Sequence, residues 1–130
     1  MVDNLKKICT EIISLDKSIR FAGIAGMMGK VVAQEFRKDL IPLLQNEEVE
    51  NSVIKSVLRM RTREDYEEKL GRAIYTFTLY EKVKRASIPL EHRDYALLMV
   101  SFDKHASHED IIMNKILPVM QREGLVKEPK

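Results

Sequence analysis

The chain has 130 residues, of which 45% are hydrophobic and 32% charged, and its 22 basic and 20 acidic side chains leave a formal net charge of +2. This length indicates one domain, which buries roughly two-thirds of the surface that its unfolded chain exposes. The composition excludes an intrinsically disordered chain. The balanced charge argues against a dedicated nucleic-acid binder and leaves only a local basic patch for that role.

The single cysteine, Cys9, excludes an intramolecular disulfide and a multi-cysteine metal site. It directly follows Ile8 in a segment with helical spacing, a position typical of a buried small apolar residue. No run approaches the roughly 20 consecutive apolar residues of a transmembrane helix, and the N-terminus lacks the pattern of a signal peptide. We therefore expect a cytoplasmic protein that does not contact a membrane.

The first segment is predicted to be a helix with one apolar stripe. Its apolar residues recur every three or four positions: Val2, Leu5, Ile8, Ile12 and Leu15. This spacing predicts a helix that ends near Asp16, and its stripe needs a flat apolar surface such as a sheet to cover it.

Residues 18–25 alternate as a strand does, with Ile19 and Phe21 on one face. The stretch from Gly26 to Gly29 predicts a hairpin turn, and residues 30–36 the partner strand. Met27 and Met28 are adjacent in this turn and cannot easily both be buried in a monomer. They are therefore candidates for a contact with a second copy or a partner.

The next region is predicted to be helical but interrupted. Residues 47–60 carry apolar side chains at helical spacing: Val49, Val53, Ile54, Val57, Leu58 and Met60. Thr62 and Asp65 then have the spacing of a capping box, which predicts a new short helix that runs to Leu70. Gly71 follows as a stop with positive φ. We therefore expect the helical region to break near residues 61–63.

Residues 71–103 contain three runs rich in aromatic and β-branched residues, at 73–80, 85–90 and 95–102, which predict a three-stranded antiparallel meander. A second capping box starts at Ser107 and predicts a last helix that ends before Gly124, with a kink or an early finish at Pro118. We expect one domain over residues 1–124 and a frayed tail over 125–130.

The order α-β-β-α-β-β-β-α predicts an α+β (α/β) fold in which helices cover both faces of a five-stranded, mostly antiparallel sheet. This order resembles that of Roadblock domains and, more broadly, of the profilin-like folds that include longin and PAS-type sensor domains. Residues 55–65 and 74–85 are also similar to a family of short archaeal proteins of unknown function, found mostly in ammonia oxidisers.

The Roadblock resemblance implies a homodimer that forms through the crossover helix and a neighbouring sheet edge. It also implies a platform for a small GTPase or another signalling protein, without catalytic residues of its own. We assign the interface to five apolar residues: Val49, Val53, Val57, Met27 and Met28.

A small-ligand sensor is the alternative interpretation. The region between the second and third strands is longer than a single helix requires, which leaves room for a pocket beside the sheet. Tyr75, Phe77 and Tyr95 are the candidate lining residues.

The densest basic feature is a set of five residues: Lys55, Arg59, Arg61, Arg63 and Arg72. Its functional interpretation is a site for an anion, for the acidic patch of a partner or for nucleic acid. The alternative is a solvated face that pairs with the neighbouring acidic residues.

The histidines do not predict a metal site. His105 and His108 have a spacing that suits two metal ligands on one helix, but His105 precedes the Ser107 cap and so falls in a loop. No nucleophile has a base and an orienting group at a recognisable spacing. We expect a protein that is not an enzyme and that holds neither a metal nor a cofactor.

Overall fold

The computed structural model describes residues 4–127. Its elements in chain order are α1 (Leu5–Ser14), β1 (Ile19–Gly26), β2 (Val31–Phe36), α2 (Asn46–Glu64), α3 (Glu67–Leu70), β3 (Thr76–Leu79), β4 (Val83–Pro89), β5 (Tyr95–Asp103), α4 (His108–Ile111), the π-helical turn η1 (Ile112–Ile116) and α5 (Leu117–Arg122). The predicted fold class is confirmed, and the first helix, the hairpin and the meander form where they were expected. Val2 of the predicted first stripe lies outside the described residues.

The five strands form one sheet in the order β2-β1-β5-β4-β3, and every neighbouring pair is antiparallel. β3, β4 and β5 are the predicted meander. β5 joins this meander to the hairpin by pairing with β1, so the first and last strands of the chain are neighbours in the middle of the sheet. β2 and β3 are left as its two edges.

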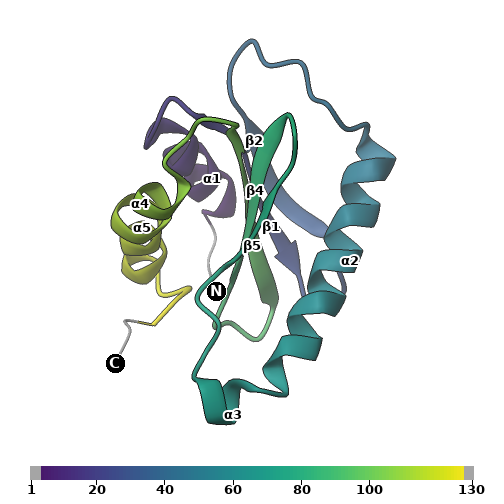
Figure 1. Ribbon diagram of the computed structural model, residues 1–130, viewed down its shortest axis with the longest axis vertical. Helices are drawn as coiled ribbons and strands as arrows, with labels where there is room; N and C mark the ends of the chain where they lie inside the picture. The colour runs from purple at the N-terminus through teal and green to yellow at the C-terminus, as the bar shows by residue number, and fades with distance from the viewer. Residues whose placement is uncertain (1–3, 128–130) are drawn as a thin grey trace.

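Helices cover both faces of the sheet (Figure 1). α1 and the C-terminal helices lie on one face, and α2 lies on the other. The larger hydrophobic core is under the first group and includes Ile12, Ile24, Phe102, Ile112 and Met120. The smaller core is under α2 and includes Val53, Val57, Met60, Leu97 and Met99.

β1 contains a bulge that its sequence did not predict. Ile19 pairs with Phe102 and Phe21 pairs with Ser101, so Arg20 is an extra residue on β1. Ile19 consequently packs in the larger core, whereas Phe21 packs against the smaller core under α2. The prediction that Ile19 and Phe21 share one face is wrong, because one inserted residue reverses the alternation of a strand.

The β1–β2 hairpin brings the sheet close to α2. The Gly26 amide donates to the Lys30 carbonyl at 2.8 Å, and Gly29 has a φ of 85°. A Cβ atom at Gly29 would lie 3.1 Å from Cγ1 of Ile54 on α2. Glycine is therefore favoured at this position both by the turn and by the approach of the helix.

α2 is one uninterrupted helix, Asn46–Glu64. The break expected near residues 61–63 is wrong, because Thr62 lies inside the helix and its Oγ1 donates to the Arg59 carbonyl at 2.7 Å. The chain changes direction only after α2, and the short helix α3 ends at Gly71, which has the expected positive φ of 85°.

The last helical segment passes through Pro118 and continues to Arg122. Proline lacks an amide hydrogen, and its ring crowds the carbonyl four residues earlier. The wider π-helical turn η1 comes immediately before and relaxes the hydrogen-bonding pattern at that point. The early finish expected at Pro118 therefore does not occur.

The hydrophobic core extends past residue 124. Leu125 and Val126 are buried in the larger core, and the Glu91 amide donates to the Leu125 carbonyl at 2.8 Å. Residues 128–130 of the expected tail lie outside the described residues.

Candidate functional site

A polar groove lies between α2 and the strands β3, β4 and β5. The flank of α2 that faces these strands carries polar residues at helical spacing: Ser52, Ser56, Arg59 and Arg63. The neighbouring stripe of the same helix is buried and apolar. α2 therefore covers one part of the sheet with apolar side chains and another part with polar ones.

The floor of the polar groove consists of two rows of side chains that cross β3, β4 and β5. Thr76, Ser87 and Met99 form one row, and Thr78, Arg85 and Ser101 form the other. Met99 belongs to the core under α2, and side chains two positions apart on a strand share a face, so both rows face this helix. Most positions on this floor carry a hydroxyl group instead of an apolar side chain.

Two arginines meet serines of α2 in the polar groove. Arg85 reaches from β4 to α2, where its Nη2 donates to Ser52 Oγ at 3.0 Å. Arg59 Nη2 donates to Ser56 Oγ at 3.3 Å within the helix. A serine hydroxyl carries no charge, so both contacts leave the positive charge of the guanidinium groups uncompensated.

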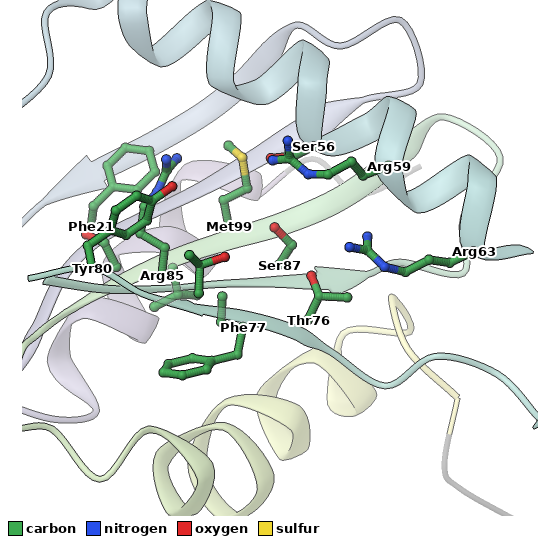
Figure 2. A pocket seen from close by; sticks show the side chains of 14 residues that line it. Phe21, Ser56, Arg59, Arg63, Thr76, Phe77, Tyr80, Arg85, Ser87 and Met99 are labelled. Atoms are coloured by element: carbon green, nitrogen blue, oxygen red, sulfur yellow. The ribbon is translucent and has the colours of Figure 1, made fainter.

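Arg63 is the third arginine of the polar groove. Its guanidinium extends from α2 toward the hydroxyl groups of Thr76 and Ser87 (Figure 2). In the described part of the chain, no carboxylate forms an ion pair with Arg59, Arg63 or Arg85. The residues that line the groove include no Asp or Glu. Positive charge and hydroxyl groups thus converge on one small space.

The predicted basic patch does not form one surface. Lys55 is exposed on the side of α2 that faces away from the sheet. Arg61 lies on the flank toward the hairpin, where its Nη2 donates to the Met27 carbonyl at 2.7 Å.

Arg72 is also separated from the rest of the predicted patch. It forms an ion pair with Glu91 and donates to the Lys127 carbonyl at 3.2 Å. Of the five predicted residues, only Arg59 and Arg63 line the polar groove.

The predicted dimer contacts occupy different environments. Val53 and Val57 are buried in the core under α2, so they do not face a second copy, and Val49 and Met27 are half-buried beside them. Met28 alone is largely exposed, at 89%. Val53 and Val57 lie on the inward stripe of α2, and periodicity alone cannot tell which apolar stripe of a helix faces the sheet.

The predicted aromatic pocket does not form. Tyr75 and Tyr95 pack against the larger core, and the Tyr95 ring stacks on His92 with the ring centroids 4.6 Å apart. Phe77 stacks on His108 with a centroid separation of 3.8 Å. Of the three, only Phe77 is among the residues that line the polar groove.

Several large apolar side chains are exposed near the edge strand β3 and on α2. Ile54 and Leu58, one helical turn apart on α2, are 45% and 56% exposed. On and just after β3, Leu79 and Tyr80 are 59% and 47% exposed. Leu79 and Tyr80 give the molecule apolar surface beside the edge of β3, which no other described strand covers, whereas Ile54 lies near Gly29 of the hairpin turn.

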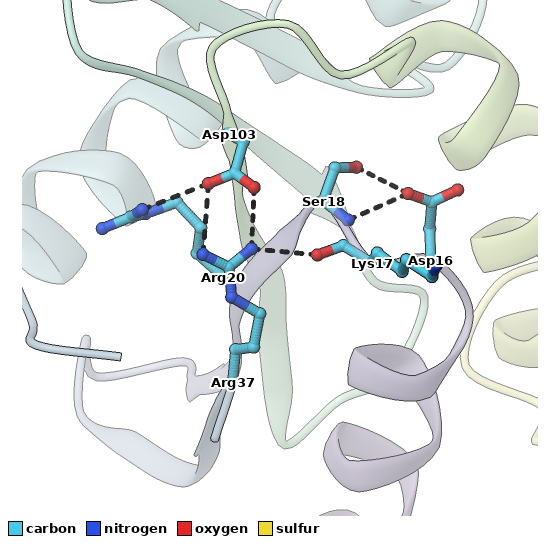
Figure 3. Close-up of polar contacts among 6 residues, drawn as sticks. All are labelled: Asp16, Lys17, Ser18, Arg20, Arg37 and Asp103. Carbon is cyan, nitrogen blue, oxygen red and sulfur yellow. Dashed lines mark hydrogen bonds and ion pairs between the residues drawn. The ribbon is translucent and has the colours of Figure 1, made fainter. Parts of the chain in front are cut away.

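A separate cluster of charges at one end of the sheet is compensated internally (Figure 3). Arg20 Nη1 donates to Asp103 Oδ1 at 3.2 Å, and Arg37 Nη1 donates to Asp103 Oδ2 at 2.7 Å. The hydrogen bonds from Arg37 and then Arg20 lower the pKa of Asp103. This cluster links β1, β5 and the end of β2. Its charged groups already have partners within the protein, so it is a poor candidate for a ligand site.

Among residues 4–127, no group of three His, Cys, Asp or Glu side chains is placed to hold a metal ion. His105 is exposed, whereas His108 begins α4 and packs on Phe77. None of the helices in this range is long and apolar enough to cross a membrane.

Comparison with solved structures identifies the fold. MglB, the gliding protein of Thermus thermophilus, superposes with a TM-score of 0.68 at 14% identity, over 95% of this chain and 84% of that one. A Roadblock/LC7 domain from Streptomyces avermitilis gives 0.67 at 8% identity, over 92% and 97% of the two chains. The chain has the Roadblock/LC7 fold. MglB of Myxococcus xanthus gives 0.65 at 10% identity, over 94% and 89%. No protein-family model and no curated protein matches the sequence.

Sequence analysis missed Arg85 and the hydroxyl groups of the groove. Arg85 ends a short basic run, residues 82–85, whose pattern is typical of a solvated strand end. A signal was available: Thr76 and Thr78 alternate with Phe77 and Leu79, which predicts a strand with one polar face. Which helix would cover that face could not be predicted from the pattern.

Proposed function

We propose that the protein is a non-enzymatic interaction module that forms a homodimer and serves as a cytoplasmic platform for a signalling protein, such as a small GTPase. The observation that carries this proposal is the exposed apolar stripe of Ile54 and Leu58 on α2, together with the open edge of β3. The Roadblock/LC7 fold supports it, and MglB, a protein of this fold, has been solved in a tetrameric arrangement.

The edge of β3 can pair with another strand. The Tyr80 amide donates to the Val83 carbonyl at 2.9 Å, and amides alternate in direction along a strand. The amides of Thr78 and Thr76 therefore point to β4, whereas those of Phe77 and Leu79 point outward. An antiparallel strand from a second copy would satisfy these outward groups and cover Leu79.

The stripe on α2 is a suitable second contact. Ile54 and Leu58 lie one turn apart, and Met28 of the hairpin is exposed near the same flank of the helix. Substitution of Ile54 or Leu58 changes this surface without changing the core. Charge at Val53 or Val57 would instead disrupt the fold, because both side chains are buried.

Sedimentation velocity over a concentration series tests the proposal. We expect a dimer for the wild-type chain, at least tenfold weaker dimerisation for the Ile54→Lys, Leu58→Lys double variant, and weaker dimerisation for Leu79→Pro, which removes one outward amide. Leu70→Lys is the matched control, since Leu70 is 83% exposed but lies on α3. A wild-type chain that stays monomeric at every concentration would contradict the proposal.

The partner proposal is tested separately. Purified small GTPases from the same genome, loaded with GDP or with a GTP analogue, are titrated against the wild-type chain. We expect at least one to bind with an affinity that depends on the nucleotide. Equal affinity in both states, or no binding across the set, would remove the GTPase from the proposal.

A further inference from the structure

The polar groove gathers hydroxyl and guanidinium groups in one partly open space beside α2. Thr76, Ser87 and Ser101 are half-buried and Thr78 is exposed, so a ligand can reach their hydroxyl groups from solvent. In the described structure, the hydroxyl groups of Thr76, Thr78, Ser87 and Ser101 have no side-chain hydrogen bond within the protein. They line the same space as Arg59, Arg63 and Arg85, which form no ion pair with a carboxylate within residues 4–127.

We propose that the polar groove is a binding site for a small phosphate-bearing ligand, held by Arg59, Arg63 and Arg85. A guanidinium group presents two parallel N–H donors that match a pair of phosphate oxygens, and a hydroxyl group supplies one more donor. A phosphate would therefore engage both kinds of group that the groove presents. Its negative charge would also reduce the repulsion among the three arginines.

The size of the groove limits the ligand. The cavity volume is about 80 Å³, whereas one ordered water requires roughly 10–15 Å³ on the same measure. This space suits one phosphate group and is far below the roughly 300–1,000 Å³ of a pocket that encloses a drug-sized molecule. The remainder of a larger ligand would lie outside, beside the exposed ring of Tyr80 at the rim.

The Asp103 cluster provides an internal contrast. There, two arginines share one carboxylate and their charges are compensated within the protein. Arg59 and Arg85 of the polar groove have serine hydroxyls as partners, which leaves their remaining N–H groups available. The same type of side chain is thus used structurally in the Asp103 cluster and is open to a ligand in the polar groove.

Isothermal titration and amide NMR shifts test this proposal with two probes, inorganic phosphate and glycerol phosphate, in a chloride buffer. We expect saturable binding of at least one probe, with shifts at Thr76, Ser87 and Ser101. Tighter binding of inorganic phosphate would identify the free ion as the ligand. Tighter binding of glycerol phosphate would identify a phosphomonoester.

Three variants make the test specific. Arg63→Gln and Arg59→Gln remove exposed charges from the groove, and each should weaken binding at least tenfold. Lys55→Gln removes the same charge from the outward side of the same helix and should change affinity less than twofold. Circular dichroism establishes that each variant is folded.

Two results would overturn the proposal. The first is the absence of saturable binding of either probe to the folded wild-type chain. The second is an equal loss of affinity in Lys55→Gln and Arg63→Gln, which would indicate diffuse attraction to a basic surface. The proposal does not depend on self-association, because every residue that holds the ligand comes from one copy of the chain.

Discussion

Cys9 illustrates how the fold sets the chemistry of a single side chain. The residue lies on α1 with its side chain fully buried, and burial raises the pKa of its thiol to about 11. At pH 8 only about one thiol in a thousand would then be ionised, and the thiolate is the reactive form. The predicted role of Cys9 as a buried small apolar residue is confirmed.

We expect Cys9 in the native protein to react with a disulfide reagent such as Ellman's reagent at least a hundredfold more slowly than in urea, because both burial and the raised pKa suppress attack. The absorbance of the released thiol measures the rate. A native rate similar to that of free cysteine would show that the thiol is accessible.

Asp103 supports the fold through its two arginines. We expect Asp103→Asn to lower the free energy of unfolding by about 1 kcal/mol at pH 7, because Arg37 and Arg20 lose their anionic acceptor and one of its two oxygens. Urea denaturation measures the difference. Asp94→Asn is a control, since the only ion pair of Asp94 in the described residues is a long one, 3.9 Å, with the neighbouring Arg93.

The effect of Asp103→Asn should depend on pH. The pKa of Asp103 is lowered from the ordinary 3.8 in the folded state. Its stabilising contribution is therefore complete above pH 3.8 and is lost as the pH falls through the lowered value. The wild type and the variant should converge in stability in acid, and a difference that persists below that range would assign the effect to packing.

The stacked pair of Phe77 and His108 joins two elements, because it holds the edge strand β3 against the start of α4. Burial and then the positive charge of Lys84, whose Nζ lies 3.4 Å from His108 Nδ1, lower the pKa of His108 below the ordinary 6.5. The folded state thus favours the neutral ring. Its stabilising contribution is complete above pH 6.5 and is lost as the pH falls to the lowered pKa.

We expect His108→Gln to flatten the fall in melting temperature of the wild type between pH 7 and pH 5, because the variant has no proton to take up at this position. His105→Gln is the matched control, since His105 is an exposed loop residue three positions earlier. Identical pH profiles for wild type and His108→Gln would mean that the stack does not sense protonation.

The elements that sequence analysis predicted well are those set by local periodicity. The meander and both terminal helices follow from alternation and from three- and four-residue spacing. The bulge at Arg20 does not follow from local periodicity, because it depends on the register with β5, a strand far along the chain. The predicted break in α2 was wrong because Thr62 suits two positions equally well, the start of a capping box and the interior of a helix.

For the whole molecule, the order of elements was sufficient to predict the Roadblock-like fold but not the candidate site. The fold depends on which segments are apolar, and that information is local. The polar groove depends on one flank of α2 meeting one face of β3 and β4. Arg59 and Arg85 therefore line the same groove only when the sheet is complete, and no spacing in the sequence predicts this arrangement.

The position of β5 between β1 and β4 has a consequence for synthesis. The first strand finds its central partner only in β5, so a chain emerging from the ribosome carries β1 with one edge unpaired and α2 without most of the sheet that it covers until β5 follows. Pairing between strands so distant in sequence is slow, and exposed strands in that interval favour aggregation. The early part of the chain should therefore depend on chaperones until the last quarter has been translated.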